Sequence, residues 1–247
     1  MTSRRILRLS GPDTRDFLQG LVTNDVARLD EGAVYTAMLT PQGKLIADFF
    51  LVPDGPDVLV DVAADLADML FKRLSMYKLR AQVTIEQTDL HLQRGTGPAP
   101  KGAVVDPRDP AMGWRAYGDA DESDDGSDWN ALRVALGIPE TGQELTPDTF
   151  ILETGFERLN GVDFRKGCYV GQEVTARMKH KTELRKGLAR VRVEGPAESG
   201  TEITADGKVA GTLHTRSGDR ALAYLRFDRA GDDMKAGDAV VTLETRL

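Results

Sequence analysis

Hydrophobic and polar positions alternate with two different periods in the first part of the chain. The runs RRILRLS (residues 4–10), AVYTAMLT (33–40) and KLIADFFLV (44–52) have the two-residue period of β-strands. Pro41-Gln42-Gly43, between the last two runs, predicts a hairpin turn. Residues 64–79 have the helical period instead, with four apolar residues on one face: Leu66, Met69, Leu70 and Leu74. The tight turns favour antiparallel pairing, so we expect an α+β sandwich.

The middle of the chain is predicted to be mostly loop. Residues 95–112 are rich in Gly and Pro and contain one short strand-like run, GAVV. The acidic tract at 119–128 begins like a calcium-binding EF-hand loop, but its twelfth position is Leu132, where a bidentate Glu is required. We therefore expect a solvated loop there. A helix capped by Asp128 and ended by Gly137 should follow.

Short β-like runs with Gly and Asp-Gly turns at regular spacing begin at Lys186 and continue to the end of the sequence. This pattern is typical of a small all-β unit, and a barrel is the natural form. We therefore divide the chain into residues 1–185, with mixed helix and strand, and residues 186–247, a C-terminal β-barrel.

Composition limits the class of protein. The chain has 247 residues, a formal charge of −7 and one cysteine, so it forms no internal disulfide. The N-terminus has no apolar run of signal-peptide length, and no segment approaches the roughly 20 apolar residues that span a bilayer. We expect a soluble, cytoplasmic protein; the alternative is an organellar protein whose presequence has been removed. Residues 165–192 carry nine Lys/Arg against two Asp/Glu, so this basic segment could attract an anionic ligand or be a solvated surface.

The cysteine lies in a polar stretch, FRKGCYVGQEVTAR, residues 164–177. A thiolate is the reactive form of cysteine, and the cations Arg165 and Lys166 beside Cys168 favour it. Gly167 and Gly171 permit backbone conformations and close approaches that other residues cannot make. The alternative is a small buried apolar residue that happens to be cysteine. The three histidines show no metal-ligand spacing with it, although a nucleophilic pair with His180 is chemically possible.

This stretch resembles a known family. KGCYVGQE resembles the signature of the YgfZ family of folate-binding proteins, which are related to the glycine-cleavage T protein. Four further segments resemble the other motifs of that family in the same order: FLQGLVTNDV, YTAMLTPQGKLIADF, YKLRAQV and ALGIPETG. The resemblance implies an α+β, three-part cloverleaf as in the aminomethyltransferase folate-binding fold, with two ferredoxin-like α/β parts and a C-terminal β-barrel.

The same resemblance implies a ligand and a set of site residues. Tetrahydrofolate or a derivative would bind in a central channel, and Cys168 would be the functional thiol. The residues that the resemblance places at the folate-binding surface are Lys166, Tyr169, Gln172, Glu173, Arg177, Trp129, Asn24 and Asp48. Trp129 could equally be a core residue that anchors its helix, and Asn24 could serve a turn. No metal site is expected.

Three functions remain to be distinguished. The resemblance favours a folate-binding accessory protein in iron–sulfur protein assembly or repair, with effects on tRNA modification and with assembly factors or client proteins as partners. The alternative is a folate-dependent aminomethyltransferase, or another weak one-carbon transferase. The T protein carries an adjacent Asp pair where this chain has Ala47-Asp48, and the chain is shorter, so a non-enzymatic role is preferred. Direct RNA binding is disfavoured, because the chain is acidic and has no RNA-recognition motif.

Overall fold

The computed structural model describes residues 3–180 and 183–247. Within them the chain forms two compact units. The sheet unit contains the chain up to Ser127 together with Glu157–Val174, and the barrel unit contains Asp128–Phe156 and Thr175–Leu247. The chain therefore enters the barrel unit, returns to the sheet unit and enters the barrel unit again.

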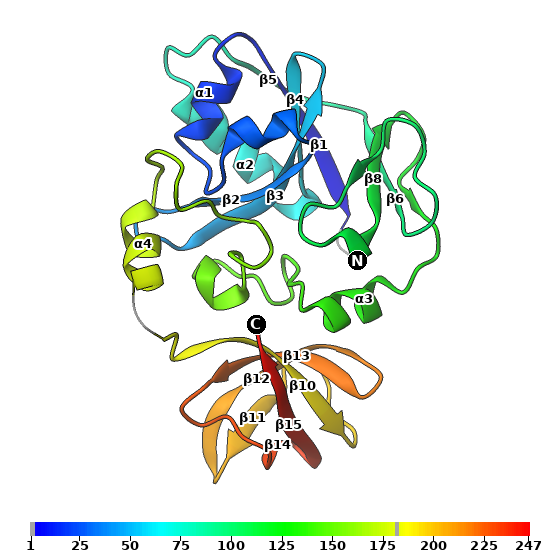
Figure 1. Ribbon diagram of the computed structural model, residues 1–247, viewed down its shortest axis with the longest axis vertical. Helices are drawn as coiled ribbons and strands as arrows, with labels where there is room; N and C mark the ends of the chain where they lie inside the picture. Colours follow the sequence, from blue (N-terminus) through cyan, green and yellow to red (C-terminus); the bar gives the residue numbers. More distant parts are fainter. Residues whose placement is uncertain (1–2, 181–182) are drawn as a thin grey trace. The chain divides into compact units, whose positions relative to one another are not determined.

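The main sheet of the sheet unit has five antiparallel strands (Figure 1) in the order β2-β3-β4-β1-β5. The strands are β1 (Arg4–Ser10), β2 (Val34–Leu39), β3 (Leu45–Asp54), β4 (Asp57–Ala63) and β5 (Thr84–Gln87). The hairpin predicted between β2 and β3 is confirmed. Its turn is closed by Thr40 N–H, which donates to the Lys44 carbonyl at 2.8 Å, and Gly43 adopts a positive φ of 75°.

Three helices accompany this sheet: α1 (Thr14–Gln19), the 3₁₀ helix η1 (Val26–Asp30) and α2 (Ala64–Tyr77). The helix predicted within residues 64–79 is confirmed as α2, but the face that it buries is rotated slightly from the predicted one. α2 buries Ala67, Leu70 and Leu74, whereas Leu66 and Met69 are only partly buried against the core. No helix in residues 3–180 and 183–247 is long and apolar enough to span a membrane.

A second sheet in the same unit has the order β7-β8-β6-β9. Its elements are β6 (His91–Gly95), β7 (Val104–Val105), the 3₁₀ helix η2 (Pro110–Met112), β8 (Trp114–Gly118) and β9 (Ser123–Asp124). β7 falls within the predicted run GAVV. Part of the acidic tract, which we expected to be loop throughout, forms β9 and pairs in parallel with β6.

A buried carboxylate joins the two sheets. Asp61 on β4 is fully buried, and it accepts hydrogen bonds from Arg4 Nε on β1 at 2.6 Å and from the Tyr117 hydroxyl on β8 at 2.8 Å. It also forms an ion pair with Arg115 on β8. Burial by itself raises the pKa of Asp61, but Arg115 and Arg4 outweigh it and lower the pKa to about 2. The carboxylate is therefore ionised at neutral pH and tied to both sheets.

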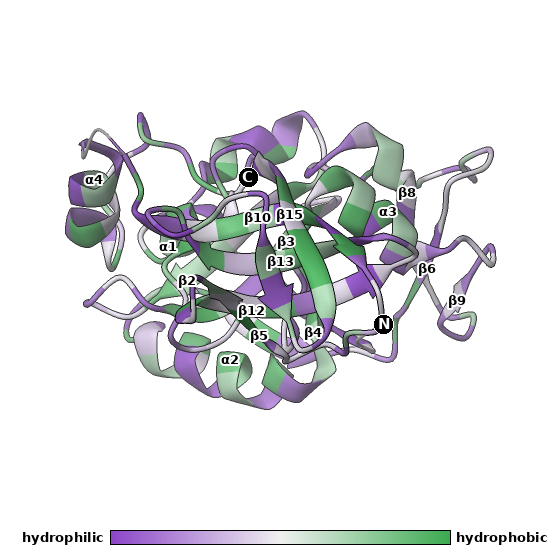
Figure 2. Ribbon diagram, turned by 90° about the horizontal axis from the view of Figure 1, so that it is seen from below, coloured by the Kyte–Doolittle hydropathy of each residue, from purple (hydrophilic) through white to green (hydrophobic). Residues whose placement is uncertain are grey.

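The barrel unit contains a closed barrel in the order β10-β13-β12-β11-β14-β15, which confirms the predicted barrel. Its strands are β10 (Lys186–Glu194), β11 (Glu202–Ala205), β12 (Lys208–Ser217), β13 (Arg220–Arg226), β14 (Met234–Ala236) and β15 (Ala239–Arg246). The barrel strands carry both apolar and polar residues (Figure 2), and the buried apolar ones form a core that includes Val191, Leu213, Leu225 and Val241.

The first part of the barrel unit packs on this barrel. It comprises α3 (Trp129–Leu136) and the 3₁₀ helix η3 (Ile151–Thr154). The predicted ends of α3 are confirmed: Asp128 accepts the Ala131 N–H at 2.9 Å, and Gly137 is left-handed at φ 67°. The fully buried Arg133 of α3 donates to Thr215 Oγ1 on β12 at 3.0 Å. The last helix, α4 (Gln172–His180), contains the division between the two units.

Candidate functional site

The cysteine lies in a loop, residues 163–171, which we call the cysteine loop. Its anchor is Lys166, whose side chain is buried. The ammonium donates hydrogen bonds to three backbone carbonyls of FLQGLVTNDV (residues 17–26), which we call the first motif. The acceptors are Gln19 at 2.7 Å, Val22 at 2.5 Å and Asn24 at 3.0 Å. An ammonium has three donors, so all of them are used within the protein. Burial lowers the pKa of Lys166 to about 8, although the nearby Asp25 and Asp163 act in the opposite direction.

Asn24 strengthens the same junction. Its amide nitrogen donates to the Tyr35 carbonyl at 2.8 Å and to the Asn160 carbonyl at 2.6 Å. Its side-chain oxygen accepts the Asp25 N–H at 2.8 Å. The neighbouring Thr23 accepts the Asp163 N–H on its backbone carbonyl, at 3.1 Å. The first motif and the cysteine loop, although about 140 positions apart, are thus hydrogen-bonded into one structure.

Cys168 is exposed on this anchored loop. The next residue, Tyr169, is buried, and its ring centroid lies 5.1 Å from the Lys166 ammonium. The alternative of a buried structural cysteine is therefore wrong, because the thiol faces solvent while the residue after it faces the protein. The loop ends at Gly171, whose φ is 86°. A Cβ there would lie 2.6 Å from the Thr40 carbonyl oxygen, so this glycine is required.

Gly167 differs from Gly171. It does not have a positive φ, and a Cβ added to it would meet no heavy atom within 4 Å in the part of the chain that the structure describes. The expectation that both glycines of the motif serve a special backbone conformation is thus correct for Gly171 and wrong for Gly167.

Asp48 lies on β3 in a buried position and accepts a hydrogen bond from the Tyr35 hydroxyl at 3.0 Å. Burial, followed by the charge of Asp48, raises the pKa of Tyr35 well above its ordinary value, so the phenol keeps its proton. Because Tyr35 also bonds to Asn24 through its carbonyl, one chain of contacts joins Asp48, Tyr35, Asn24 and Lys166.

The structure places the remaining predicted site residues in α4 and in the barrel unit. Gln172 and Glu173 form the first turn of α4, where Gln172 is half-buried and Glu173 is exposed. Arg177, in the last turn, is exposed and belongs to the barrel unit. Trp129, also in the barrel unit, is the first residue of α3 and is buried.

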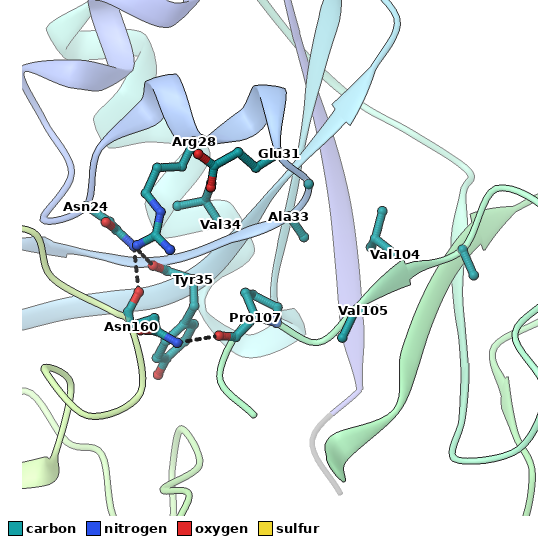
Figure 3. A pocket seen from close by; sticks show the side chains of 12 residues that line it. Asn24, Arg28, Glu31, Ala33, Val34, Tyr35, Val104, Val105, Pro107 and Asn160 are labelled. Carbon is teal, nitrogen blue, oxygen red and sulfur yellow. Dashed lines mark hydrogen bonds between the residues drawn. The ribbon is translucent and has the colours of Figure 1, made fainter. Parts of the chain in front are cut away.

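Two residues of this site were missed in the sequence. Tyr35 and Asn160 both line a cavity of about 450 Å³ in the sheet unit (Figure 3). Asn160 has a left-handed backbone, with φ 53°, and its side-chain amide donates to the Pro107 carbonyl at 3.0 Å. The available signal for Tyr35 was its place in the same hairpin as Asp48, 13 positions before it.

Among residues 3–180 and 183–247, no three His, Cys, Asp or Glu side chains lie close enough together to hold a metal ion. The chain has one cysteine, so an iron–sulfur cluster held by four cysteine thiolates, the usual number, would need the other thiolates from another molecule.

Comparison with known proteins gives the relationship. Residues 185–246 match the family described as "CAF17, C-terminal beta-barrel domain". The chain is 37% identical to the "Iron-sulfur cluster assembly factor IBA57 homolog, mitochondrial" of Neurospora crassa, over 84% of this chain and 56% of that protein. It is 32% identical to the mitochondrial IBA57 of Mus musculus, over 92% of this chain and 77% of that protein. The chain therefore spans only about half the length of the Neurospora relative.

The fold has a solved counterpart. The aminomethyltransferase T of the glycine cleavage system from Bartonella henselae superimposes with a TM-score of 0.73, covering 99% of this chain and 83% of that one, at 13% identity. Together with the matched barrel, this confirms the predicted fold class, an α+β fold of the aminomethyltransferase type with a C-terminal β-barrel. At this identity the likeness concerns the fold alone.

Two sequence-based expectations change. The prediction of a cytoplasmic protein is wrong, because the relatives are named as mitochondrial proteins. These relatives are named IBA57, and none of them is named YgfZ. The resemblance to the YgfZ family therefore stays a prediction. With 32% identity to mouse IBA57 over most of both chains, the protein belongs to the family of the iron–sulfur cluster assembly factor IBA57.

Proposed function

We propose that this protein acts in the assembly or repair of iron–sulfur proteins and that Cys168 is the thiol through which it does so. The observation that carries the proposal is an exposed cysteine on an anchored loop. Membership of the IBA57 family supports a role in iron–sulfur cluster assembly. Its partners would be assembly factors or client proteins, and clients would include tRNA-modifying enzymes that carry clusters, as the YgfZ resemblance suggests.

The step that we assign to Cys168 is ligation of a cluster that is passing to or from a partner. The thiol loses its proton to water, and the thiolate donates an electron pair to an iron atom. Because the chain has one cysteine, the remaining ligands come from the partner or from a small thiol. Anchoring by Lys166 limits the loop's motion, so less conformational entropy is lost when the ligand binds.

A complementation experiment tests the thiol. In a strain that lacks the gene, Cys168→Ala should leave cluster-enzyme activity at the level of the deletion, because the ligand atom is gone. Gly167→Ala, a matched change at the preceding position, should restore activity, since a Cβ there would meet no heavy atom of the described residues within 4 Å. Full restoration by Cys168→Ala, with equal protein levels, would remove the thiol from the proposal.

We also propose that a reduced folate binds this fold. Asp48 is the candidate contact for such a ligand, because a carboxylate accepts hydrogen bonds from the amino and ring N–H groups of a pterin, and the bond from the Tyr35 hydroxyl holds this carboxylate in place. Tyr169, Gln172 and Glu173 remain candidates for contact. Lys166 and Asn24 fit less well as ligand contacts, because their donors are used by backbone carbonyls, and we assign them to positioning the loop.

Anaerobic calorimetry with tetrahydrofolate tests this second part separately. Wild-type protein should bind at micromolar strength or better, and Asp48→Asn should weaken binding about tenfold or more, because a charge-assisted hydrogen bond is lost. Asp54→Asn, which changes an exposed acid of the same strand, should have no effect. Absence of binding to folded wild-type protein would refute the folate proposal and leave the thiol proposal standing.

A further inference from the structure

The end of α2 and the loop after it expose three apolar side chains. Met76 is 75% exposed, Tyr77 is 40% exposed and Leu79 is 87% exposed. The buried face of α2 is formed by Ala67, Leu70 and Leu74, so the core does not need the exposed three. Green and purple segments alternate along α2 in Figure 2, as expected for a helix with one apolar face.

Leu79 is also strained. Its φ is 45°, in the left-handed region, where a Cβ approaches the following carbonyl oxygen and where a bulky residue is an outlier. Glycine or asparagine would adopt this conformation at lower cost. A large apolar side chain therefore occupies a position where the backbone conformation costs free energy and where the side chain is not buried. A functional constraint is the usual reason for such a residue.

The loop around Leu79 is held by hydrogen bonds on both sides. Lys78 N–H donates to the Leu74 carbonyl at 3.0 Å, and Ala81 N–H donates to the Lys78 carbonyl at 2.8 Å. Farther along, the Gln82 N–H donates to Asp13 Oδ2 at 2.8 Å. The exposure of Leu79 is therefore part of an ordered structure.

Positively charged residues flank these apolar side chains in the sequence. From residue 72 to residue 80 the chain has four cations and no acid, in a protein of net charge −7. These cations are Lys72, Arg73, Lys78 and Arg80. None of them forms an ion pair with an acid of the described residues. We call the three apolar residues and the four cations together the α2 patch.

We infer that the α2 patch is a docking surface for a protein partner that has an apolar pocket with acidic residues around it. Leu79 and Met76 would fill the pocket, and the cations would pair with the acidic rim. This arrangement of an apolar centre and a polar rim is typical of protein interfaces. Complementary charge would also fix the orientation of the partner.

Other anionic surfaces fit less well. Nucleic acids bind through cations and stacked aromatic rings, and these contacts could use Tyr77 but not Leu79 or Met76, the two most exposed apolar residues of the patch. An amphipathic helix lies on a membrane through its apolar face, but the apolar face of α2 is buried in the core of the sheet unit. The inference stands apart from the proposed function, because it requires neither Cys168 nor a folate.

The first step of the test identifies the partner in cells. A photoreactive phenylalanine analogue replaces Met76 in the full chain, and the adducts formed on illumination are identified by mass spectrometry. We expect a protein with an acidic surface, which is then purified and titrated calorimetrically against the unmodified chain. Absence of a protein adduct, or adducts with lipid or RNA only, would overturn the inference.

The second step asks whether the patch makes the contact. Leu79→Asn should weaken the purified partner's binding about tenfold or more, as expected for a buried interface anchor, while the melting temperature stays equal or rises because strain is relieved. Lys78→Glu with Arg80→Glu should weaken binding similarly, more so at low salt. Val209→Ala, at an exposed valine of the barrel, is the control and should bind normally. Unchanged binding by both patch variants would refute the inference.

Discussion

At the scale of single residues, Lys166 and its neighbour Arg165 show what the sequence leaves undecided. Both cations precede Cys168, yet Lys166 is buried among three carbonyls and Arg165 is exposed. Nothing in the local sequence distinguishes them, because the carbonyls that bury Lys166 lie more than 140 positions earlier. The same long-range contacts explain why Asn24, predicted at the folate surface, directs its amide to backbone oxygens.

Lys166→Met should lower the free energy of unfolding by about 2–4 kcal/mol at pH 7. Methionine has a similar length but leaves three carbonyl oxygens without the ammonium that they now accept from, and a buried unsatisfied polar group costs about 1–3 kcal/mol. Urea unfolding measures the change. Arg165→Met is the control and should stay within about 0.5 kcal/mol, as for most surface substitutions. Equal losses in the two variants would show that the carbonyl contacts contribute little.

At the scale of elements, the sequence predicted those turns and helix ends that are determined by residues within a few positions of each other. The β2–β3 turn and the cap residues of α3 were predicted because Pro, Gly and Asp act within a few positions. The second sheet was missed apart from one short strand. β8 reads WRAYG, and its buried Arg115 looks polar in sequence. Its pairing with two buried acids, Asp61, 54 positions earlier, and Asp106, makes that arginine an interior residue.

Gly171→Ala should destabilise the protein, with a cost of at least about 1 kcal/mol. The residue has a positive φ, and its new Cβ would lie 2.6 Å from the Thr40 carbonyl oxygen and 2.9 Å from Leu39 Cβ, so the junction of the cysteine loop with the β2–β3 turn must shift. Thermal unfolding measures the effect. Gly167→Ala should be close to neutral. If both substitutions had the same effect, the assigned difference between the two glycines would be wrong.

Asp61→Asn should destabilise the sheet unit by about 3–5 kcal/mol at pH 7, because it removes the counter-charge that Arg4 and Arg115 share and leaves Arg115 only the more distant Asp106, at 3.5 Å. The pKa of Asp61 in the folded protein, about 2, is below its ordinary value of 3.8. Its contribution is therefore complete above pH 4 and is lost as the pH falls from about 4 to 2. The stability difference between wild-type and variant should shrink over that range.

The control for Asp61 is Asp54→Asn, which removes a partly exposed ion pair with Arg8. Such surface pairs contribute about 0–1 kcal/mol. Urea unfolding of the three proteins at pH 7, 4 and 3 gives the comparison. A difference between wild-type and Asp61→Asn that stays constant from pH 7 to pH 3 would contradict the assignment of the ionised carboxylate as the link between the sheets.

At the scale of the whole molecule, the hardest feature to predict was that each of the two units is built from segments that are not continuous in the sequence. The change in pattern at Lys186 marks the start of the barrel, and the structure confirms that barrel. The barrel unit also includes Asp128–Phe156, however, which the sequence grouped with the preceding residues. Helical periodicity identified α3 but carried no information about the strands against which this helix packs. The proposed division at residue 185 stays a prediction, and the stability of the C-terminal fragment tests it.

The isolated fragment 186–247 should be much less stable than the barrel within the full chain. It keeps the closed strands, but it loses Val134, which packs against Leu188 and Leu222, and Glu144, which accepts the Thr215 N–H at 3.1 Å. A domain of about 60 residues is marginal even when complete. Adding a peptide of residues 128–156 in trans should raise the fragment's melting temperature, measured by circular dichroism, whereas the same peptide with Arg133→Met and Glu144→Gln should not. A fragment whose melting temperature the peptide does not change would be an independent domain, as the division at residue 185 implies.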